Sequence, residues 1–428
     1  MFQPMEVRGK VPTGTLHRII YSMFLCALFA LPWLNQAHVS TILFILTGVA
    51  LLFTGIFRID YSFYGKQLTV IAFGIYFVLQ LVACYGYPVF DNIHEIEEKA
   101  ALLGIPLLLY MLTLTYEDIW HRGLNSFVLG CIAASLWCMT IAIVQYSHTH
   151  DAGVFFYHSY SSAVGLNAIY FSLYLLTSIG YVVLNQTSFN PYFVKGIGIF
   201  LYINLLLLSS KIAIAIGSLL LLILLFKAIK NNWQKVTLLI VAAGVYLILT
   251  TTVNPIRKRF ADVTIASYSS ALTATNFKDY PFDGLSLRLV LWRLGYELMN
   301  EKGLWLKGDG GAHYKEDLNA KMMNYQLYTG NSKNGDTGYL NYNMHNQYME
   351  SYMQYGIAGG ILILTVLGYA LYLAVRYSNA MLVYAVVLFM VFFLTESVLE
   401  TQSGILLFTI IISGEWIQLQ RKRPGIVI

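Results

Sequence analysis

The sequence predicts an all-α, polytopic membrane protein with about 12 transmembrane helices and one large polar loop. Hydrophobic residues make up 57% of the 428-residue chain and charged residues only 11%, with a mean hydropathy of +0.61. Soluble domains are about one-quarter charged. Apolar runs near the ~20 residues needed to cross a bilayer recur along the chain. A single polar interval, Asn254 to about Tyr355, interrupts them.

The apolar runs define the predicted spans and divide the chain into three parts. We expect spans at about 19–36, 39–57, 67–85, 100–115, 124–146, 163–185, 195–209, 212–229, 236–253, 357–375, 380–398 and 403–418. Residues 1–253 would hold the first nine spans, residues 254–356 an external loop, and residues 357–428 the last three spans with a cytoplasmic tail. An even number of spans puts both termini on one side.

Basic residues in the short loops set the expected orientation. One side collects most of them, including Arg58, Arg122 and Lys235, while short loops on the other side offer only Lys99 and Lys211. Loops rich in Lys and Arg stay in the cytoplasm. Both termini are therefore expected in the cytoplasm and the polar interval outside. The net charge of +5 follows this topology and indicates no nucleic-acid partner.

No pattern in the sequence indicates a metal or another cofactor. The four cysteines, Cys26, Cys84, Cys131 and Cys138, lie inside apolar segments without ligand or disulfide spacing. No carboxylate pair stands at D-x-D spacing, and no His/Cys/Asp cluster shows ligand spacing. The charged run Glu95–Lys99 precedes the fourth span and is expected to form a solvated cap on the outer side.

Three segments of the polar interval are predicted to be helical. Gly284–Asn300 has apolar residues at helical spacing, and Gly303 follows as a stop. A second helix is expected over Tyr314–Tyr328. The third, His345–Tyr355, has interleaved apolar and polar residues and leads through Gly356 into the tenth span.

Three cations in or near this interval are candidates for binding a phosphate. Lys211 interrupts two apolar runs at a sharp outward turn, as either a snorkelling lysine or a fixed cation for a lipid phosphate. Arg288 lies one helical turn before Trp292, and it is either solvated or a bidentate phosphate ligand. Arg293 points to a different helix face, so these two arginines should not form one clamp.

Two histidines are candidates for acid–base chemistry. His345 is expected just inside a helix start, where the positive end of the helix dipole favours a neutral imidazole. Such a ring could accept a proton from a sugar hydroxyl. The alternative is a surface or capping histidine. His313, which follows a glycine-rich turn, is a weaker candidate.

Several short motifs occur in a characteristic order. They are Ser209-Ser210-Lys211, the segment Ser286–Trp292, the glycine turn Gly308–Gly311, His345-Asn346 and the segment Tyr355–Gly359. In this order, around one large external loop, the sequence resembles the O-antigen ligase and O-antigen polymerase superfamily of bacterial envelope enzymes.

The resemblance implies a GT-C-like membrane glycosyltransferase of the bacterial inner membrane. Such enzymes take a glycan from undecaprenyl diphosphate at the periplasmic face and join it to an acceptor, without metal or nucleotide sugar. By this resemblance, Arg288 would bind the diphosphate and His345 would deprotonate or orient the acceptor hydroxyl. Lys211 stands where the family commonly carries arginine, which keeps the charge but loses the bidentate fork. Arg293, His313 and Trp292 are secondary candidates.

Three functions remain open at this point. The first is a ligase that transfers glycan to lipid A–core, with inversion at the anomeric carbon. The second is a polymerase whose acceptor is another lipid-linked repeat. The third is a twelve-span transporter or flippase. The large loop and the scarcity of ionisable residues within the spans argue against transport. Glu396 and Glu400, near the outer end of the eleventh span, are exceptions.

Overall fold

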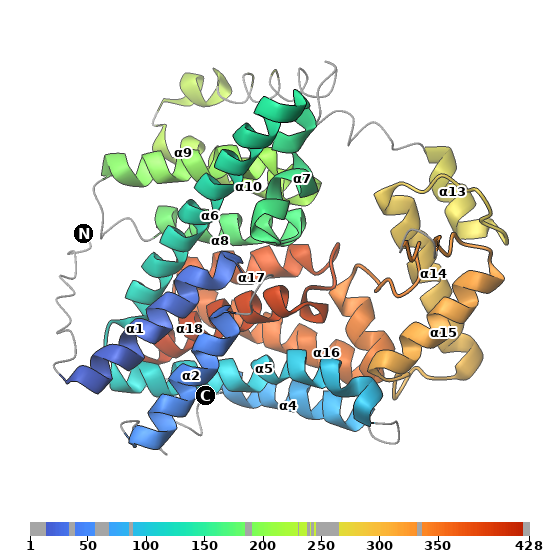
Figure 1. Cartoon of the computed structure of the whole chain (residues 1–428), viewed down its shortest axis with the longest axis horizontal. Helices are drawn as coiled ribbons and strands as arrows, with labels where there is room; N and C mark the ends of the chain where they lie inside the picture. The colour runs from blue at the N-terminus through green and yellow to red at the C-terminus, as the bar shows by residue number, and fades with distance from the viewer. Residues whose placement is uncertain are drawn as a thin grey trace. The chain divides into compact units, whose positions relative to one another are not determined.

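The computed structural model describes residues 14–33, 39–55, 68–84, 89–184, 191–229, 231–237, 240, 244, 265–331 and 336–422. Every regular element in these ranges is an α-helix or a short 3-10 helix (Figure 1), which confirms the all-α prediction. The chain forms two compact units. The first comprises Met1–Ile59 and Met111–Asp262, and the second comprises Asp60–Tyr110 and Val263–Ile428.

Five helices of the described residues are long and apolar enough to cross a membrane. They are Thr15–Trp33, Glu95–Thr115, Ile119–Thr149, Gln347–Arg376 and Gln402–Arg421, and the bent pair Tyr157–Val164 with Ala168–Leu184 would add a sixth. Shorter apolar helices include Val39–Thr54 and Ala380–Phe392. The protein is thus a helical membrane protein. The count of about 12 spans stays a prediction, and the span expected at 236–253 lies almost wholly outside the described residues.

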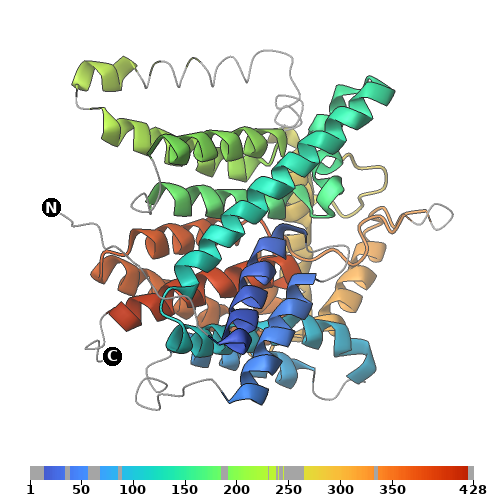
Figure 2. The ribbon, with the colours of Figure 1, turned by 60° about the vertical axis from the view of Figure 1, so that its left-hand side comes forward.

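The first unit is built around the long helix α6. Its described elements are α1 (Thr15–Ala30), η1 (Leu31–Trp33), α2 (Val39–Thr54), α6 (Ile119–Thr149), η2 (Ala152–Phe155), α7 (Tyr157–Ser161), η3 (Ser162–Val164), α8 (Ala168–Leu184), α9 (Pro191–Leu207) and α10 (Lys211–Ala228). Small residues let α1 pack closely on α6 (Figure 2), as is common between membrane helices. A Cβ at Gly130 would lie 2.1 Å from the carbonyl oxygen of Phe29.

The second unit joins membrane helices to the helices of the polar interval. Its described elements are α4 (Leu68–Ala83), most of α5 (Val89–Thr115), α13 (Ile265–Thr273), α14 (Gly284–Lys302), α15 (Gly311–Asn324), α16 (Gln347–Arg376), α17 (Ala380–Phe392), η6 (Val398–Glu400) and α18 (Gln402–Lys422). Helix α16 packs on α4 and α17, and α18 is the most deeply buried candidate span. Helices α13, α14 and α15 gather near the start of α16 (Figure 1).

Local capping explains where the helices of the polar interval begin and end. Asp283 caps α14 through a capping box with Ser286, and Gly303, at φ 64°, ends the helix. The helix predicted over Gly284–Asn300 is confirmed. Helix α15 spans Gly311–Asn324, about one turn earlier than the predicted Tyr314–Tyr328. It ends there because the chain turns at Gln326, where φ is 55°.

The glycine turn fastens the polar interval to a kink in α16. Gly308 and Gly356 both have positive φ, 71° and 61°, and a Cβ at Gly308 would lie 2.5 Å from the backbone of Gln354. The backbone N–H groups of Asp309 and Gly310 donate to carbonyls on α16 at 2.8 and 3.1 Å. Two of the motifs noted in the sequence therefore meet in space.

The charged run Glu95–Lys99 is only partly solvated, because Glu97 is exposed but Lys99 is buried. It lies within α5, and the Lys99 side chain is only 2% exposed. Its ammonium pairs with Glu400 at 3.1 Å and donates to Gln354 at 2.7 Å. The expectation failed at Lys99 because its partners come from α16 and η6, which tertiary packing brings to α5.

Candidate functional site

Arg288 and His345 meet at one buried carboxylate, that of Glu396. The Arg288 Nη2 atom lies 2.6 Å from Glu396 Oε1, and His345 Nδ1 lies 3.3 Å from Glu396 Oε2. Glu396 is 6% exposed. Its two oxygens thus hold the two residues at which the sequence predicted phosphate binding and acid–base chemistry. We call these three residues the His345 site.

Helix α14 presents Arg288 and Trp292 on the side that faces this carboxylate. Arg288 also donates to the carbonyls of Gly284 at 2.6 Å and Thr395 at 3.1 Å. These contacts use three of the five N–H donors of the guanidinium. One turn later, Trp292 Nε1 donates to the carbonyl of Met344 at 2.7 Å. Met344 immediately precedes His345.

His345 lies outside the helix in which the sequence placed it. Helix α16 begins at Gln347 with Asn346 as its N-cap, so His345 precedes the cap. The histidine has φ 44° and is about one-quarter exposed. With an ionised Glu396, Nδ1 carries the proton and donates to Oε2. This tautomer leaves the Nε2 lone pair directed away from Glu396 and able to accept a proton.

Arg293 belongs to a separate cluster on another face of α14. Its Nε atom pairs with Glu297 at 2.8 Å, Nη1 donates to the carbonyl of Ala274 at 2.7 Å, and the guanidinium lies over the ring of Tyr325. Partial burial opposes the charge on Glu297. Hydrogen bonds from Tyr325 and Arg293 outweigh this effect and place the pKa of Glu297 below its usual value. These contacts tie α14 to α13 and α15.

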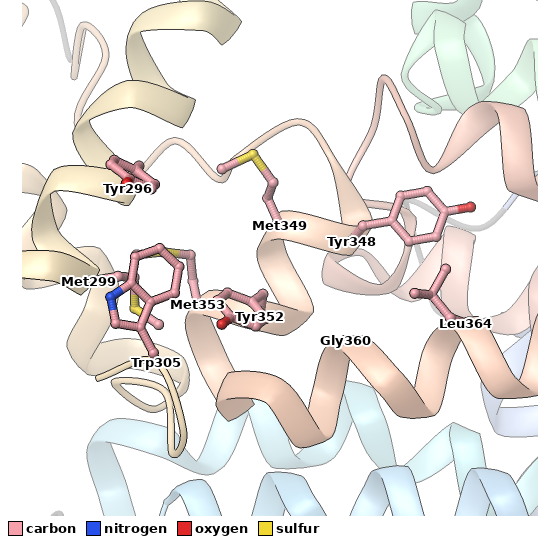
Figure 3. A pocket seen from close by; sticks show the side chains of 9 residues that line it. All are labelled: Tyr296, Met299, Trp305, Tyr348, Met349, Tyr352, Met353, Gly360 and Leu364. Atoms are coloured by element: carbon pink, nitrogen blue, oxygen red, sulfur yellow. The ribbon is translucent and has the colours of Figure 1, made fainter. Parts of the chain in front are cut away.

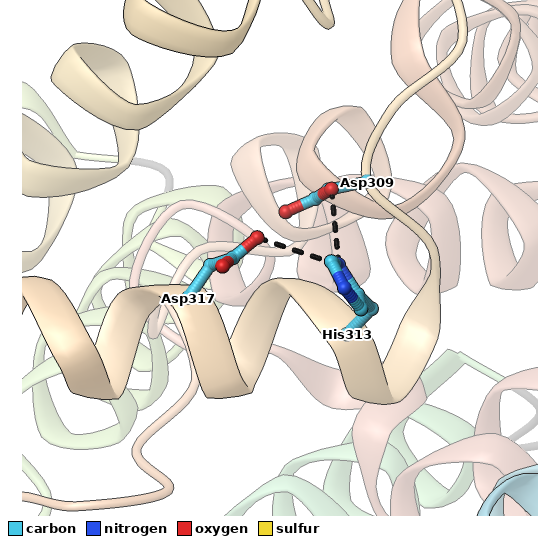
Figure 4. A group of neighbouring side chains, drawn as sticks. All are labelled: Asp309, His313 and Asp317. Atoms are coloured by element: carbon cyan, nitrogen blue, oxygen red, sulfur yellow. Dashed lines mark hydrogen bonds and ion pairs between the residues drawn. The ribbon is translucent and has the colours of Figure 1, made fainter.

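His313 lies in a second histidine group, with Asp309, Asp317 and Lys302. His313 Nδ1 lies 3.2 Å from Asp309 and 3.3 Å from Asp317 (Figure 4). Donor atoms of these three residues lie within 4.8 Å of one another, a spacing that could hold a metal ion. The ammonium of Lys302 also pairs with both carboxylates. A metal ion would have to displace this cation. We call the four residues the His313 cluster.

Lys211 lies in the first unit, where it is the first residue of α10. The preceding chain turns sharply at Ser209, where φ is 50°. Arg288 and His345 belong to the second unit. The expected role of Lys211 at a phosphate stays a prediction.

A family profile covers most of these candidate residues. Residues 196–364 match the family described as O-antigen ligase. This match confirms the resemblance to the O-antigen ligase and polymerase superfamily, and the matched segment contains Lys211, Arg288 and His345. No curated protein matches the chain.

Glu396 lies outside the matched residues 196–364 and was not among the predicted site residues. One signal was available in the sequence, because Glu396 is a carboxylate at the outer end of an otherwise apolar run. Ionisable residues at such positions are costly and mark functional sites. The sequence alone could not show that Glu396 would face both Arg288 and His345.

An apolar groove lies between α14 and α16 (Figure 3). Its volume is about 280 Å³, and it is lined by Tyr296, Met299, Trp305, Tyr348, Met349, Tyr352, Met353, Gly360 and Leu364. Aromatic and methionine side chains at the start of α16 form much of its wall. Leu364, in the membrane-spanning part of α16, is 56% exposed, so the groove continues onto the outer face of that helix.

Proposed function

We propose that the protein is an O-antigen ligase. It transfers a glycan from undecaprenyl diphosphate to a lipid A–core acceptor at the periplasmic face of the inner membrane. The observation that carries this proposal is the shared carboxylate of Glu396, which holds a phosphate-binding side chain and a proton acceptor in one place. The match to the O-antigen ligase family supports the same conclusion.

In this proposal Arg288 binds the diphosphate of the donor. Three of its N–H groups donate to Gly284, Thr395 and Glu396, and the other two supply donors for phosphate oxygens. Negative charge grows on the diphosphate as the bond to the sugar breaks, and a fixed cation stabilises that charge. Lys211 would supply a second cation, without the bidentate geometry of arginine.

His345 acts on the acceptor. Its Nε2 atom takes the proton of the acceptor hydroxyl while the hydroxyl oxygen bonds to the anomeric carbon. The bond from that carbon to the diphosphate oxygen breaks, and the diphosphate leaves with the electron pair. Attack opposite the leaving group inverts the anomeric centre. Glu396 holds the Nδ1–H tautomer and stabilises the imidazolium that forms.

The groove between α14 and α16 fits the hydrocarbon chain of the donor lipid. Its lining is apolar and flexible, because methionine and aromatic side chains adapt to irregular chains. Tyr296 of the groove lies two turns after Arg288 on the same helix. A chain in the groove would therefore place its diphosphate end toward Arg288.

The proposed topology follows the charge pattern of the sequence. With about 12 spans in a GT-C-like arrangement, both termini lie in the cytoplasm and the polar interval faces the periplasm. This places Arg288 and His345 on the side where lipid-linked glycans are joined to their acceptors.

Reconstitution tests the proposal. The purified protein is placed in proteoliposomes with a lipid-linked glycan and, separately, with lipid A–core or a second lipid-linked repeat as acceptor. Mass spectrometry identifies the product. A ligase yields glycan on lipid A–core only. Growth of the lipid-linked chain would identify a polymerase instead, and no transfer to either acceptor would reject both.

A further inference from the structure

Every backbone N–H group from Met344 to Gln347 donates a hydrogen bond. His345 itself has φ 44°, a conformation that costs free energy for a non-glycine residue and persists only when its surroundings impose it. The four donors are Met344 N to Glu350 Oε2 at 2.8 Å, His345 N to Asn343 Oδ1 at 2.9 Å, Asn346 N to Ser397 Oγ at 3.2 Å, and Gln347 N to the carbonyl of Phe393 at 2.8 Å.

Glu350 supplies the carboxyl group of this set, and its side chain is fully buried. Oε2 accepts from Met344 N at 2.8 Å and from Ser397 Oγ at 3.3 Å. Oε1 accepts from the Tyr314 hydroxyl and from Gln354 Nε2 at 3.0 Å. A carboxylate offers about four acceptor positions, and all four partners here are donors.

The partners of Oε2 flank the two residues that face each other in the His345 site. Met344 immediately precedes His345, and Ser397 immediately follows Glu396. One oxygen atom therefore joins the backbone beside the histidine to the segment that carries its carboxylate partner. Ser397 Oγ also accepts from Asn346 N, which fixes the other side of His345.

We propose that Glu350 is a positioning residue for glycan transfer. It holds His345 in its left-handed conformation and at hydrogen-bonding distance from Glu396, so that Nε2 meets the acceptor hydroxyl. This inference rests on the proposed function, because it assigns Glu350 a role through His345. Glu350 touches neither the imidazole ring nor Arg288 in any contact of the described residues.

Gln354 links Glu350 to a buried ion pair. Its amide nitrogen donates to Glu350 Oε1 at 3.0 Å, and its amide oxygen accepts from the ammonium of Lys99 at 2.7 Å. Lys99 in turn pairs with Glu400 at 3.1 Å. These contacts fix the Glu350 side chain beside the His345 turn.

The test is Glu350→Gln, which keeps the shape of the side chain but replaces one acceptor oxygen with a donor. We expect kcat for transfer to fall about tenfold to a hundredfold, as for a small misplacement of a catalytic group. KM for the lipid-linked donor should stay within about twofold, because Arg288 keeps its contacts. Hydrogen exchange at the amides of Met344 and Asn346 should accelerate.

Ser351→Ala is the matched control. Ser351 is a fully buried neighbour on α16 that bonds to Tyr76 and Gln347 rather than to the backbone of the His345 turn. The Ser351→Ala variant should leave kcat and amide exchange at the His345 turn unchanged. Should Glu350→Gln fail to fold, Ser397→Ala removes one bond to the same oxygen, together with the bond from Asn346 N, and should lower kcat about threefold to tenfold.

A His345→Ala background separates positioning from general destabilisation. Glu350→Gln should lower the residual rate no further when the imidazole is already gone. An equal further loss, or wild-type kcat and amide protection in both Glu350→Gln and Ser397→Ala, would overturn the inference. Full transfer by His345→Ala would instead reject the proposed function, while amide exchange would still report whether Glu350 holds the turn.

Discussion

The His345 site and the His313 cluster look alike in composition but differ in construction. Each places a histidine beside carboxylate and cation, and the two histidines are similarly exposed, 27% and 34%. At the His345 site one buried carboxylate serves both cation and imidazole. In the His313 cluster two carboxylates serve one imidazole, and Lys302 pairs with both of them.

The difference shows which of the two sites keeps groups free to bind or react with a substrate. His313 and Asp317 lie one turn apart on α15, and Asp309 lies in the glycine turn just before that helix, so these three residues are close in sequence. The His345 site draws its members from α14, from the chain before α16 and from the turn after α17. It leaves N–H donors on Arg288 and a lone pair on His345 for substrates. The His345 site is assembled from distant parts of the chain and keeps these groups available to substrates, and this favours it as the reaction centre.

The largest expected effect is that of His345→Ala. Removal of a positioned base should lower the transfer rate about 10²- to 10⁴-fold. The rate is measured in proteoliposomes from the formation of lipid A–core carrying the glycan. Gel filtration of the solubilised protein controls for folding. Near-normal transfer in a folded variant would move the reaction centre away from His345.

Arg288→Lys should have the next largest effect. The charge stays, but the bidentate fork is lost, as are some contacts to Glu396, Gly284 and Thr395. We expect kcat/KM for the lipid-linked donor to fall about tenfold to a hundredfold, the size expected for one or two charge-assisted hydrogen bonds. Both KM and kcat should change, because Arg288 binds the diphosphate and also stabilises the charge that grows on it as the bond breaks. An unchanged KM for the donor would argue that Arg288 does not bind the diphosphate.

The two arginines of α14 extend the comparison, because Arg293 joins helices rather than facing the His345 site. Arg293→Ala should lower the free energy of unfolding by about 1–2 kcal/mol and leave kcat unchanged. The pKa of Glu297 in the folded protein lies below its pKa in the unfolded chain, and the unfolded value is about 4.3. Its contribution to stability is therefore present above that pH and lost as the pH falls through the folded-state pKa. Thermal unfolding at pH 7 and pH 4 measures both effects.

The smallest expected effect is that of His313→Ala. Transfer should stay within about twofold of wild type, because Lys302 continues to pair with Asp309 and Asp317. Activity should also be insensitive to EDTA. A large loss of transfer in His313→Ala would show that the His313 cluster takes part in the reaction. The same would follow if EDTA abolished transfer by the wild-type protein and a divalent metal restored it.

The sequence predicted features that depend on local physical chemistry. Helix α14 follows from its apolar spacing and its stop at Gly303, and Arg288 and Trp292 share a face as one turn of helix requires. The start of α16 was misplaced by two residues, because the cap at Asn346 depends on its side-chain geometry. That small shift moved His345 from the helix to a strained turn before it.

Features that depend on distant partners could not be read from the sequence. Lys99 lies in a run of charges and was expected in solvent, yet α16 and η6 enclose it. Glu396 stands out as a carboxylate in an apolar run, but only the fold brings the turn after α17 to both Arg288 and His345. Glu350 looked like one polar residue of an amphipathic helix. Its four donors come from four separate positions along the chain.

The most direct test of the central claim is a double-mutant cycle on Arg288 and His345. Single-turnover transfer of lipid-linked glycan is measured for Arg288→Ala, His345→Ala and the double variant. If the two residues act on one transition state, the combined loss is far smaller than the product of the single losses. Losses that simply multiply would show that Arg288 and His345 act independently, and would contradict a shared reaction centre at Glu396.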